Sequence, residues 1–126
     1  MPLYIIGLGL SDEKDITARG MDLISKCDKI YLDTYTAKIS VTGEQLSESL
    51  GKEIVQVTRD MMEGKEAAIK MCEEAVEGAE VGFLVPGDPF VGTDHFSMLK
   101  LAREKGTQVE VVHNASISSA VGCTGL

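Results

Sequence analysis

Three groups of residues that could bind or react with a ligand occur at the ends of apolar runs that we predict to be β-strands. The groups are Gly7–Leu10, Pro86–Phe90 and His113–Ile117, and the runs are Tyr4–Leu8, Val81–Val85 and Val109–Val112. In open parallel α/β sheets, ligands bind beyond the carboxyl ends of the strands. We therefore expect the three groups to form one binding site at a single edge of a sheet.

The first group has two of the three glycines of a dinucleotide-binding fingerprint. Gly7 and Gly9 would let a ligand or a neighbouring backbone approach closely, although a tight turn could also require them. The fingerprint needs a third glycine where this chain has Asp12, and Glu13 and Asp15 follow. Three carboxylates at this position would repel a pyrophosphate. The loop is thus predicted to suit a neutral or cationic ligand.

The second group is a proline-rich loop around one carboxylate. Pro86 and Pro89 each have a fixed φ, so this loop should be rigid and should aim Asp88 in one direction. Asp88 could then accept hydrogen bonds from a ribose or an ammonium group. The structural alternative is a turn in which the Asp88 carboxylate accepts a hydrogen bond from its own backbone.

The third group combines a histidine with small polar residues. Asn114 or Ser116 could cap a final helix, and we expect the Asn114 side chain to act in this way. His113 is more typical of a buried, hydrogen-bonded histidine than of a catalytic base. Ser116 lacks the sequence context of a nucleophile. The sequence therefore predicts no catalytic residue here.

Strands and helices alternate along the whole chain, which predicts an α/β fold with a five-stranded, mostly parallel sheet and helices on both faces. Further strands are expected at Lys29–Leu32 and Glu53–Val57. The expected helices run from Asp15 or Thr17 to Cys27, from Thr42 to Gly51, from Asp60 or Glu63 to Gly78, and from Thr93 or Asp94 to Gly106. Their expected buried positions include Ala18, Met21, Ile24 and Cys27 in the first helix and Ala68, Ile69, Cys72, Ala75 and Val76 in the third.

Composition narrows the classes of function. The 126 residues suit one domain, and the net charge of −8 without a basic cluster argues against binding to nucleic acid or anionic membranes. No apolar run approaches the ~18 residues of a membrane span. Three cysteines without a CxxC pair and two histidines indicate reduced, cytosolic thiols and no structural zinc. The apolar, uncharged end from Ala120 onward suggests a fragment of a longer chain.

The motifs, in this order, resemble the diphthine synthase family of tetrapyrrole-methylase-like, class III S-adenosylmethionine-dependent methyltransferases. The resemblance runs from Tyr4 to Leu126. The segments that carry the resemblance are Tyr4–Leu10, Lys14–Thr17 with Gly20, Tyr31–Thr36, Gly87–Phe90, His113–Ile117 and Ala120–Leu126. The His-Asn-Ala-Ser-Ile run and the Tyr35-Thr36 pair point to diphthine synthase rather than to the wider superfamily.

This resemblance implies two α/β domains with S-adenosylmethionine in the cleft between them, in a cytoplasmic homodimer. Residues 1–126 would be the N-terminal domain and inactive alone. The family's cofactor contacts carry over onto Leu10, Asp88, Val91, Ser116 and Ile117. The implied substrate is the modified histidine of elongation factor 2, which carries a 3-amino-3-carboxypropyl group. Methylation would give a trimethylated amine, or also a methyl ester, with S-adenosylhomocysteine as the second product.

The sequence departs from the superfamily pattern at two positions. Ser11 stands where a glycine is common, and Val91 stands where relatives can carry a small residue. The first loop could therefore differ in width from that of relatives, and a contact at Val91 would be made by the backbone.

Two other functions stay open at this point. One is a nicotinamide dinucleotide-binding oxidoreductase domain. The absence of the third glycine of the fingerprint argues against it. The other is a non-enzymatic flavodoxin-like or receiver module. A receiver needs an acidic pair after its first strand and a lysine after its fifth, whereas this chain has Gly7–Gly9 and His113-Asn114.

Overall fold

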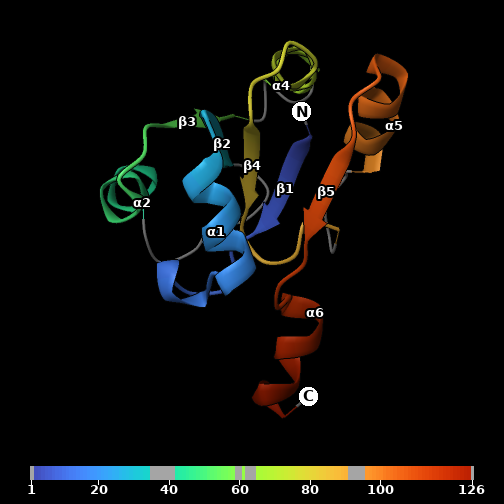
Figure 1. Ribbon diagram of the computed structural model, residues 1–126. Helices are drawn as coiled ribbons and strands as arrows, with labels where there is room; N and C mark the ends of the chain where they lie inside the picture. Colours follow the sequence, from blue (N-terminus) through green and yellow to red (C-terminus); the bar gives the residue numbers. More distant parts are fainter. Residues whose placement is uncertain (1, 35–41, 59–60, 62–64, 91–95, 126) are drawn as a thin grey trace.

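The computed structural model describes residues 2–34, 42–58, 61, 65–90 and 96–125. Its centre is a five-stranded sheet in the order β3-β2-β4-β1-β5, in which all neighbouring strands are parallel (Figure 1). The strands are β1 (Leu3–Gly7), β2 (Lys29–Asp33), β3 (Ile54–Val57), β4 (Val81–Val85) and β5 (Val109–Val112). The predicted parallel α/β sheet is confirmed, with the third strand at an edge.

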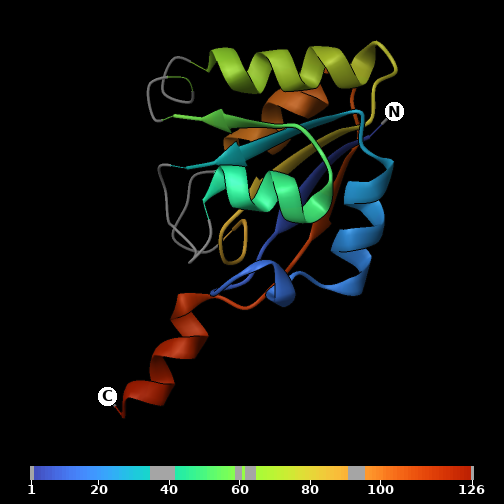
Figure 2. The same cartoon turned by 90° about the vertical axis from the view of Figure 1, so that its left-hand side faces the viewer.

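Helices cover both faces of this sheet, as predicted (Figures 1 and 2). The helices α1 (Ala18–Lys26) and α2 (Gly43–Leu50) lie on one face, and α4 (Glu66–Val76) and α5 (Phe96–Lys105) lie on the other. The central strand β1 contributes to both cores, because side chains alternate along a strand. Leu3 and Ile5 pack with α4 and α5, whereas Tyr4 and Ile6 pack with α1 and α2.

Local signals for the ends of α1 and α2 proved reliable. Thr17 caps α1 through a bond from the Gly20 backbone N–H. Thr42 and Gln45 form the expected capping box at the start of α2, and Gly51 ends that helix with a φ of +65°. These signals act within one turn of helix, so the sequence contains all the information they need.

The predicted buried face of α1 was right at Ile24 and Cys27 and wrong at Ala18 and Met21. Ala18 and Met21 are exposed, and the buried residues of the helix are Gly20, Leu23 and Ile24. A Cβ at Gly20 would lie 3.1 Å from Ile6 Cγ2, so α1 approaches the sheet most closely at this glycine. A pattern based on apolar side chains overlooks a glycine that packs through its backbone.

The start and the flank of α4 also differ from the prediction. The helix begins after Lys65, which has a φ of +60° and makes no side-chain cap, while Asp60 and Glu63 lie outside the described residues. Met71 is buried instead of Val76, which is exposed. At 100° per residue, Val76 lies roughly a quarter of a turn from the centre of the buried stripe.

The chain after β5 leaves the body of the molecule. The helix α6 (Ile117–Ala120) and the 3₁₀ turn η2 (Val121–Thr124) extend away from the sheet, beyond the carboxyl ends of the strands (Figures 1 and 2). A second 3₁₀ turn, η1 (Glu13–Asp15), lies between β1 and α1. Within the described part of the chain, no helix is long and apolar enough to cross a membrane.

Candidate functional site

The loops after β1 and β4 are joined directly through their backbones. Gly87 N donates to Gly9 O at 2.7 Å, and Gly9 N donates to Gly87 O at 3.3 Å. Both glycines have positive φ values, +80° at Gly9 and +72° at Gly87. A Cβ at Gly7 would lie only 2.6 Å from Gly87 O. The glycines thus allow a close backbone-to-backbone contact between two loops. The sequence had left open whether they serve such an approach or a tight turn.

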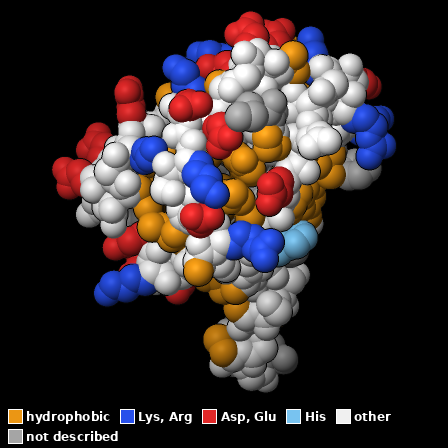
Figure 3. Space-filling view, viewed as in Figure 1, with side chains coloured by type: hydrophobic (Ala, Val, Ile, Leu, Met, Phe, Trp, Pro, Cys, Tyr) orange, Lys and Arg blue, Asp and Glu red, His pale blue; other side chains and the backbone are white. Residues whose placement is uncertain are grey.

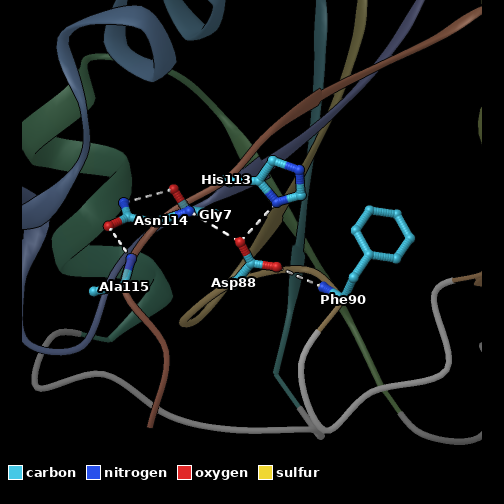
Figure 4. Close-up of polar contacts among 6 residues, drawn as sticks. All are labelled: Gly7, Asp88, Phe90, His113, Asn114 and Ala115. Atoms are coloured by element: carbon cyan, nitrogen blue, oxygen red, sulfur yellow. Dashed lines mark hydrogen bonds and ion pairs between the residues drawn. The ribbon is translucent and has the colours of Figure 1, made fainter. Parts of the chain in front are cut away.

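Asp88 joins the loop after β4 to the loop after β5 (Figure 4). Its carboxylate Oδ1 accepts from the backbone N–H of Phe90 at 2.9 Å, which is the predicted turn within its own loop. Oδ2 accepts from Asn114 N at 3.1 Å and lies 2.8 Å from His113 Nδ1. The residue is only 7 % exposed. Its carboxylate is therefore occupied mainly by contacts within the protein.

These contacts keep Asp88 ionised. Burial by itself would raise the pKa of the carboxyl group, but the hydrogen bonds from Phe90 N, Asn114 N and His113 together outweigh burial and lower the pKa below its ordinary value. An ionised carboxylate only accepts hydrogen bonds. His113 Nδ1 must therefore carry the proton in this contact, which leaves the lone pair of the neutral ring on Nε2.

Asn114 is one of two residues of the site that the sequence analysis misjudged. We expected its side chain to cap the last helix, but α6 begins after Ser116, whose side chain also makes no capping bond. Instead, Asn114 Nδ2 donates to Gly7 O at 3.1 Å and to Asp15 O at 3.0 Å, and Oδ1 accepts from Ala115 N at 2.7 Å. Asn114 thereby fixes the first loop against the third.

His113 was expected to be buried, and this expectation was wrong. Its side chain is 70 % exposed, although its Nδ1 is bonded to buried Asp88. The ring lies near Phe90, with ring centroids 6.3 Å apart and planes tilted by 59°. Figure 4 shows the second ring nitrogen on the side away from Asp88.

Four of the five predicted cofactor-binding residues lie on the joined loops. Leu10, which is 37 % exposed, follows the bridged Gly9, while Ser116 and the 69 % exposed Ile117 follow Asn114. Asp88 forms the link described above. Val91, like Tyr35 and Thr36, lies outside the described residues. The structure thus brings three loops to one edge of the sheet, and their contact with a cofactor stays a prediction.

A family model described as tetrapyrrole (corrin/porphyrin) methylases matches residues 2–125. The chain belongs to this family. A solved structure described as diphthine synthase superimposes on the methylase domain with a TM-score of 0.91 at 38% identity, and covers 100% of this chain. A putative diphthine synthase from Entamoeba histolytica gives a TM-score of 0.82 at 40% identity over 98% of the chain. The resemblance stated from the motifs is confirmed.

Curated relatives agree with the solved structures. A probable diphthine methyl ester synthase of Arabidopsis thaliana is 46% identical over 98% of this chain. The match covers 46% of that relative, and 49% and 45% of the two solved chains. This chain therefore spans about half the length of the proteins it matches.

Proposed function

We propose that this chain is the cofactor-binding part of an S-adenosylmethionine-dependent methyltransferase of the diphthine synthase type. The cofactor would lie at the carboxyl-edge site, defined as the loops Gly7–Leu10, Pro86–Phe90 and His113–Ile117. The observation that carries the proposal is the joining of these loops by the Gly9–Gly87 bridge and by Asp88 and Asn114. The names of similar proteins then favour S-adenosylmethionine, the cofactor of a methyltransferase, over other ligands that could bind at such an edge.

The residues at this edge fit S-adenosylmethionine better than a dinucleotide. The cofactor has no phosphate and carries a positive charge, so the carboxylates of Asp12, Glu13 and Asp15 would not repel it. Asp12 Oδ1 and Asp15 Oδ2 accept bonds from Lys14 N and Ser11 N, which places both carboxylates within the first loop. The described residues therefore offer negative charge where a pyrophosphate would need donors.

Leu10, Ser116 and Ile117 are the residues that we propose to hold the cofactor, together with the backbone around Asp88. Leu10 and Ile117 present exposed apolar surface, which an adenine ring could cover. The Asp88 side chain already accepts two backbone bonds and contacts His113, so its main contribution would be to fix the loop. A backbone contact at Val91 stays part of the proposal.

S-adenosylmethionine supplies a methyl group on a sulfonium, a leaving group that needs no acid. The protein would chiefly align donor and acceptor and exclude water, an effect worth up to ~7–11 kcal/mol in favourable cases. A rigid edge suits this task, because the bonds of Asp88 and Asn114 hold three loops in a fixed relation. A second domain, which we propose to complete the cleft, would shield the other side.

The proposed substrate is the modified histidine of elongation factor 2, whose side chain offers an amine and a carboxylate. The support is the similarity to proteins named diphthine methyl ester synthase. We further propose a cytoplasmic homodimer for the whole protein. Figure 3 shows acidic and basic side chains interspersed on one face of the described residues, without a broad basic area on that face, which fits a protein partner better than nucleic acid.

Calorimetric titration with S-adenosylhomocysteine and with NAD⁺ tests the cofactor. The 126-residue chain should bind S-adenosylhomocysteine weakly and NAD⁺ not at all, and the full-length protein should bind the first ligand more tightly. The short chain alone should transfer no methyl group. Binding of NAD⁺ in preference would support an oxidoreductase domain, and failure of the full-length protein to bind S-adenosylhomocysteine would contradict the proposal.

A further inference from the structure

The pair formed by Asp88 and His113 combines a buried acceptor with an exposed ring. Asp88 is 7 % exposed and lies 2.8 Å from His113 Nδ1, whereas the His113 side chain is 70 % exposed. Two backbone N–H groups, from Phe90 and Asn114, hold the carboxylate in place. The carboxylate can therefore orient the ring without moving itself.

This geometry leaves a basic nitrogen facing outward. Since the carboxylate accepts from Nδ1, the neutral ring keeps its lone pair on Nε2, on the side away from Asp88 (Figure 4). A histidine oriented in this way can accept a proton at Nε2. Phe90 lies beside the ring, at 6.3 Å between centroids.

The proposed enzyme could methylate an amine or a carboxylate, and only methylation of the amine needs such a proton acceptor. An α-amino group is largely protonated at neutral pH and has no lone pair until it loses a proton. A carboxylate acceptor is already ionised and has no proton to lose. Amine methylation therefore depends on a base, and ester formation does not.

We propose that Nε2 of His113 accepts the proton of the substrate amine, with Asp88 as the residue that positions the ring. This inference rests on the proposed function. The ammonium group first transfers one proton to Nε2, and solvent later removes that proton from the ring. The freed amine then forms a bond to the methyl carbon while the bond of that carbon to sulfur breaks, and its electron pair stays on sulfur. Each successive methylation of the amine requires the removal of one such proton.

Other titratable side chains in or next to the carboxyl-edge site suit this role less well. Asp12 and Asp15 accept bonds from the backbone of their own loop, and a carboxylate is a much weaker base than an imidazole. Asp88 itself is buried and held ionised. Among the described residues of the three loops, His113 alone presents an imidazole to the outside.

The test uses His113→Gln in the full-length protein, because glutamine can still donate to Asp88 but offers no basic nitrogen. We expect the amine methylation rate to fall about 100-fold through kcat, with binding of S-adenosylhomocysteine and thermal stability little changed. Asp88→Asn should lower the same rate by less. Asp22→Asn, at an exposed ion pair of α1 with Lys26, is the control and should match the wild type.

Ester formation provides the matched comparison. With a substrate whose amine is already trimethylated, His113→Gln should form the ester within about threefold of the wild-type rate. Equal losses in the amine and ester reactions would show a structural role for His113 and overturn the inference. An unchanged amine rate in His113→Gln would also overturn it.

Nitrogen NMR of the histidine rings gives a second readout that does not depend on activity. The His113 ring should show a protonated Nδ1 and an unprotonated Nε2 when neutral, and Asp88→Asn should reduce this preference. The opposite tautomer in the wild type would contradict the inference. A wild-type protein that methylates neither group contradicts the proposed function instead. If the wild type methylates the amine but makes no ester, the amine rate of His113→Gln and the NMR signal of the ring test the inference.

Discussion

At the edge of the sheet where strands begin, Gly51, Gly78 and Gly106 each follow a helix and precede β3, β4 or β5. All three have positive φ values, and no atom of the described residues lies within 4 Å of a Cβ built on any of them. At the opposite edge, where strands end, a Cβ at Gly7 would meet Gly87 O at 2.6 Å. The same residue type thus serves local backbone conformation at one edge and contact between loops at the other.

The side chains show a similar but weaker contrast. At the carboxyl edge, four of the contacts of Asp88 and Asn114 join residues between 25 and 107 positions apart in the sequence. At the amino edge, the turns after α2 and α4 close through backbone bonds within a few residues, such as Gly51 N to Glu48 O. The segments before β2 and β4 are also joined there, because Glu80 N donates to Asp28 Oδ2 at 3.0 Å. A turn that only connects two elements can be closed locally, whereas loops that together form a binding site must be kept in register.

The largest difference between the edges should appear when alanine replaces glycine. Gly7→Ala places a methyl group against Gly87 O and Asn114 Cβ, and we expect a loss of about 3 kcal/mol in the free energy of unfolding. Gly51→Ala meets no neighbour and should cost about 1 kcal/mol through its positive φ. Urea unfolding of both variants measures this, and equal losses would remove the distinction between the edges.

Asn114→Ala should have the next largest effect. It removes the bonds to Gly7 O and Asp15 O and from Ala115 N, at an expected cost of about 2 kcal/mol. Hydrogen exchange at the Gly87 amide, which donates to Gly9 O, should also become faster because the loops separate. Ser119→Ala, which removes only an exposed bond to Ser116 O, is the control. Slow exchange at Gly87 in the Asn114 variant would contradict this role.

Asp88→Asn should give a smaller loss that depends on pH. The native pKa of Asp88 is lowered, so its contribution to stability is complete above the ordinary aspartate pKa of about 4 and is lost as the pH falls through the native value. We expect the variant to be about 1.5 kcal/mol less stable at pH 7 and to approach the wild type near pH 3. Urea unfolding at pH 7, 5 and 3 tests the sign, and a difference that grows on acidification would show it to be wrong.

The smallest effect is expected for a long-range side-chain contact at the amino edge. Lys52 Nζ donates to Ser25 O at 3.0 Å and to Cys27 O at 3.3 Å. Because this contact is partly exposed to water, Lys52→Met should lower stability by less than about 1 kcal/mol. A loss larger than that of Asn114→Ala in the same urea series would show that the amino edge also depends on contacts between distant residues.

The strands and most helix ends could be predicted because their causes are local. Strand β1 is apolar on both faces, and the capping box of Thr42 and Gln45 needs only four residues. The buried face of α1 could not be predicted in the same way. Its register depends on the close approach of Gly20 to Ile6, which is a property of how the helix sits on the sheet.

Prediction of the site reached the level of loops but not of individual side chains. The rule that ligands bind beyond the carboxyl ends of strands correctly grouped the loops of Leu10, Asp88 and Ser116. The roles of Asn114 and His113 were misjudged, because an amide or imidazole near a strand end can bond to many partners. Which partner it finds depends on the order of strands in the sheet.

The sequence by itself determined the alternation of strands and helices, the turns that end the helices, and the resemblance of its motifs to a methyltransferase family. Only the tertiary structure decided that Asn114 bonds to Gly7 and Asp15, and that Asp88 is buried beneath an exposed His113. The physical reason is the distance along the chain over which each interaction acts. Dihedral preferences and capping act between near neighbours, whereas these bonds form only after β1 has been placed between β4 and β5.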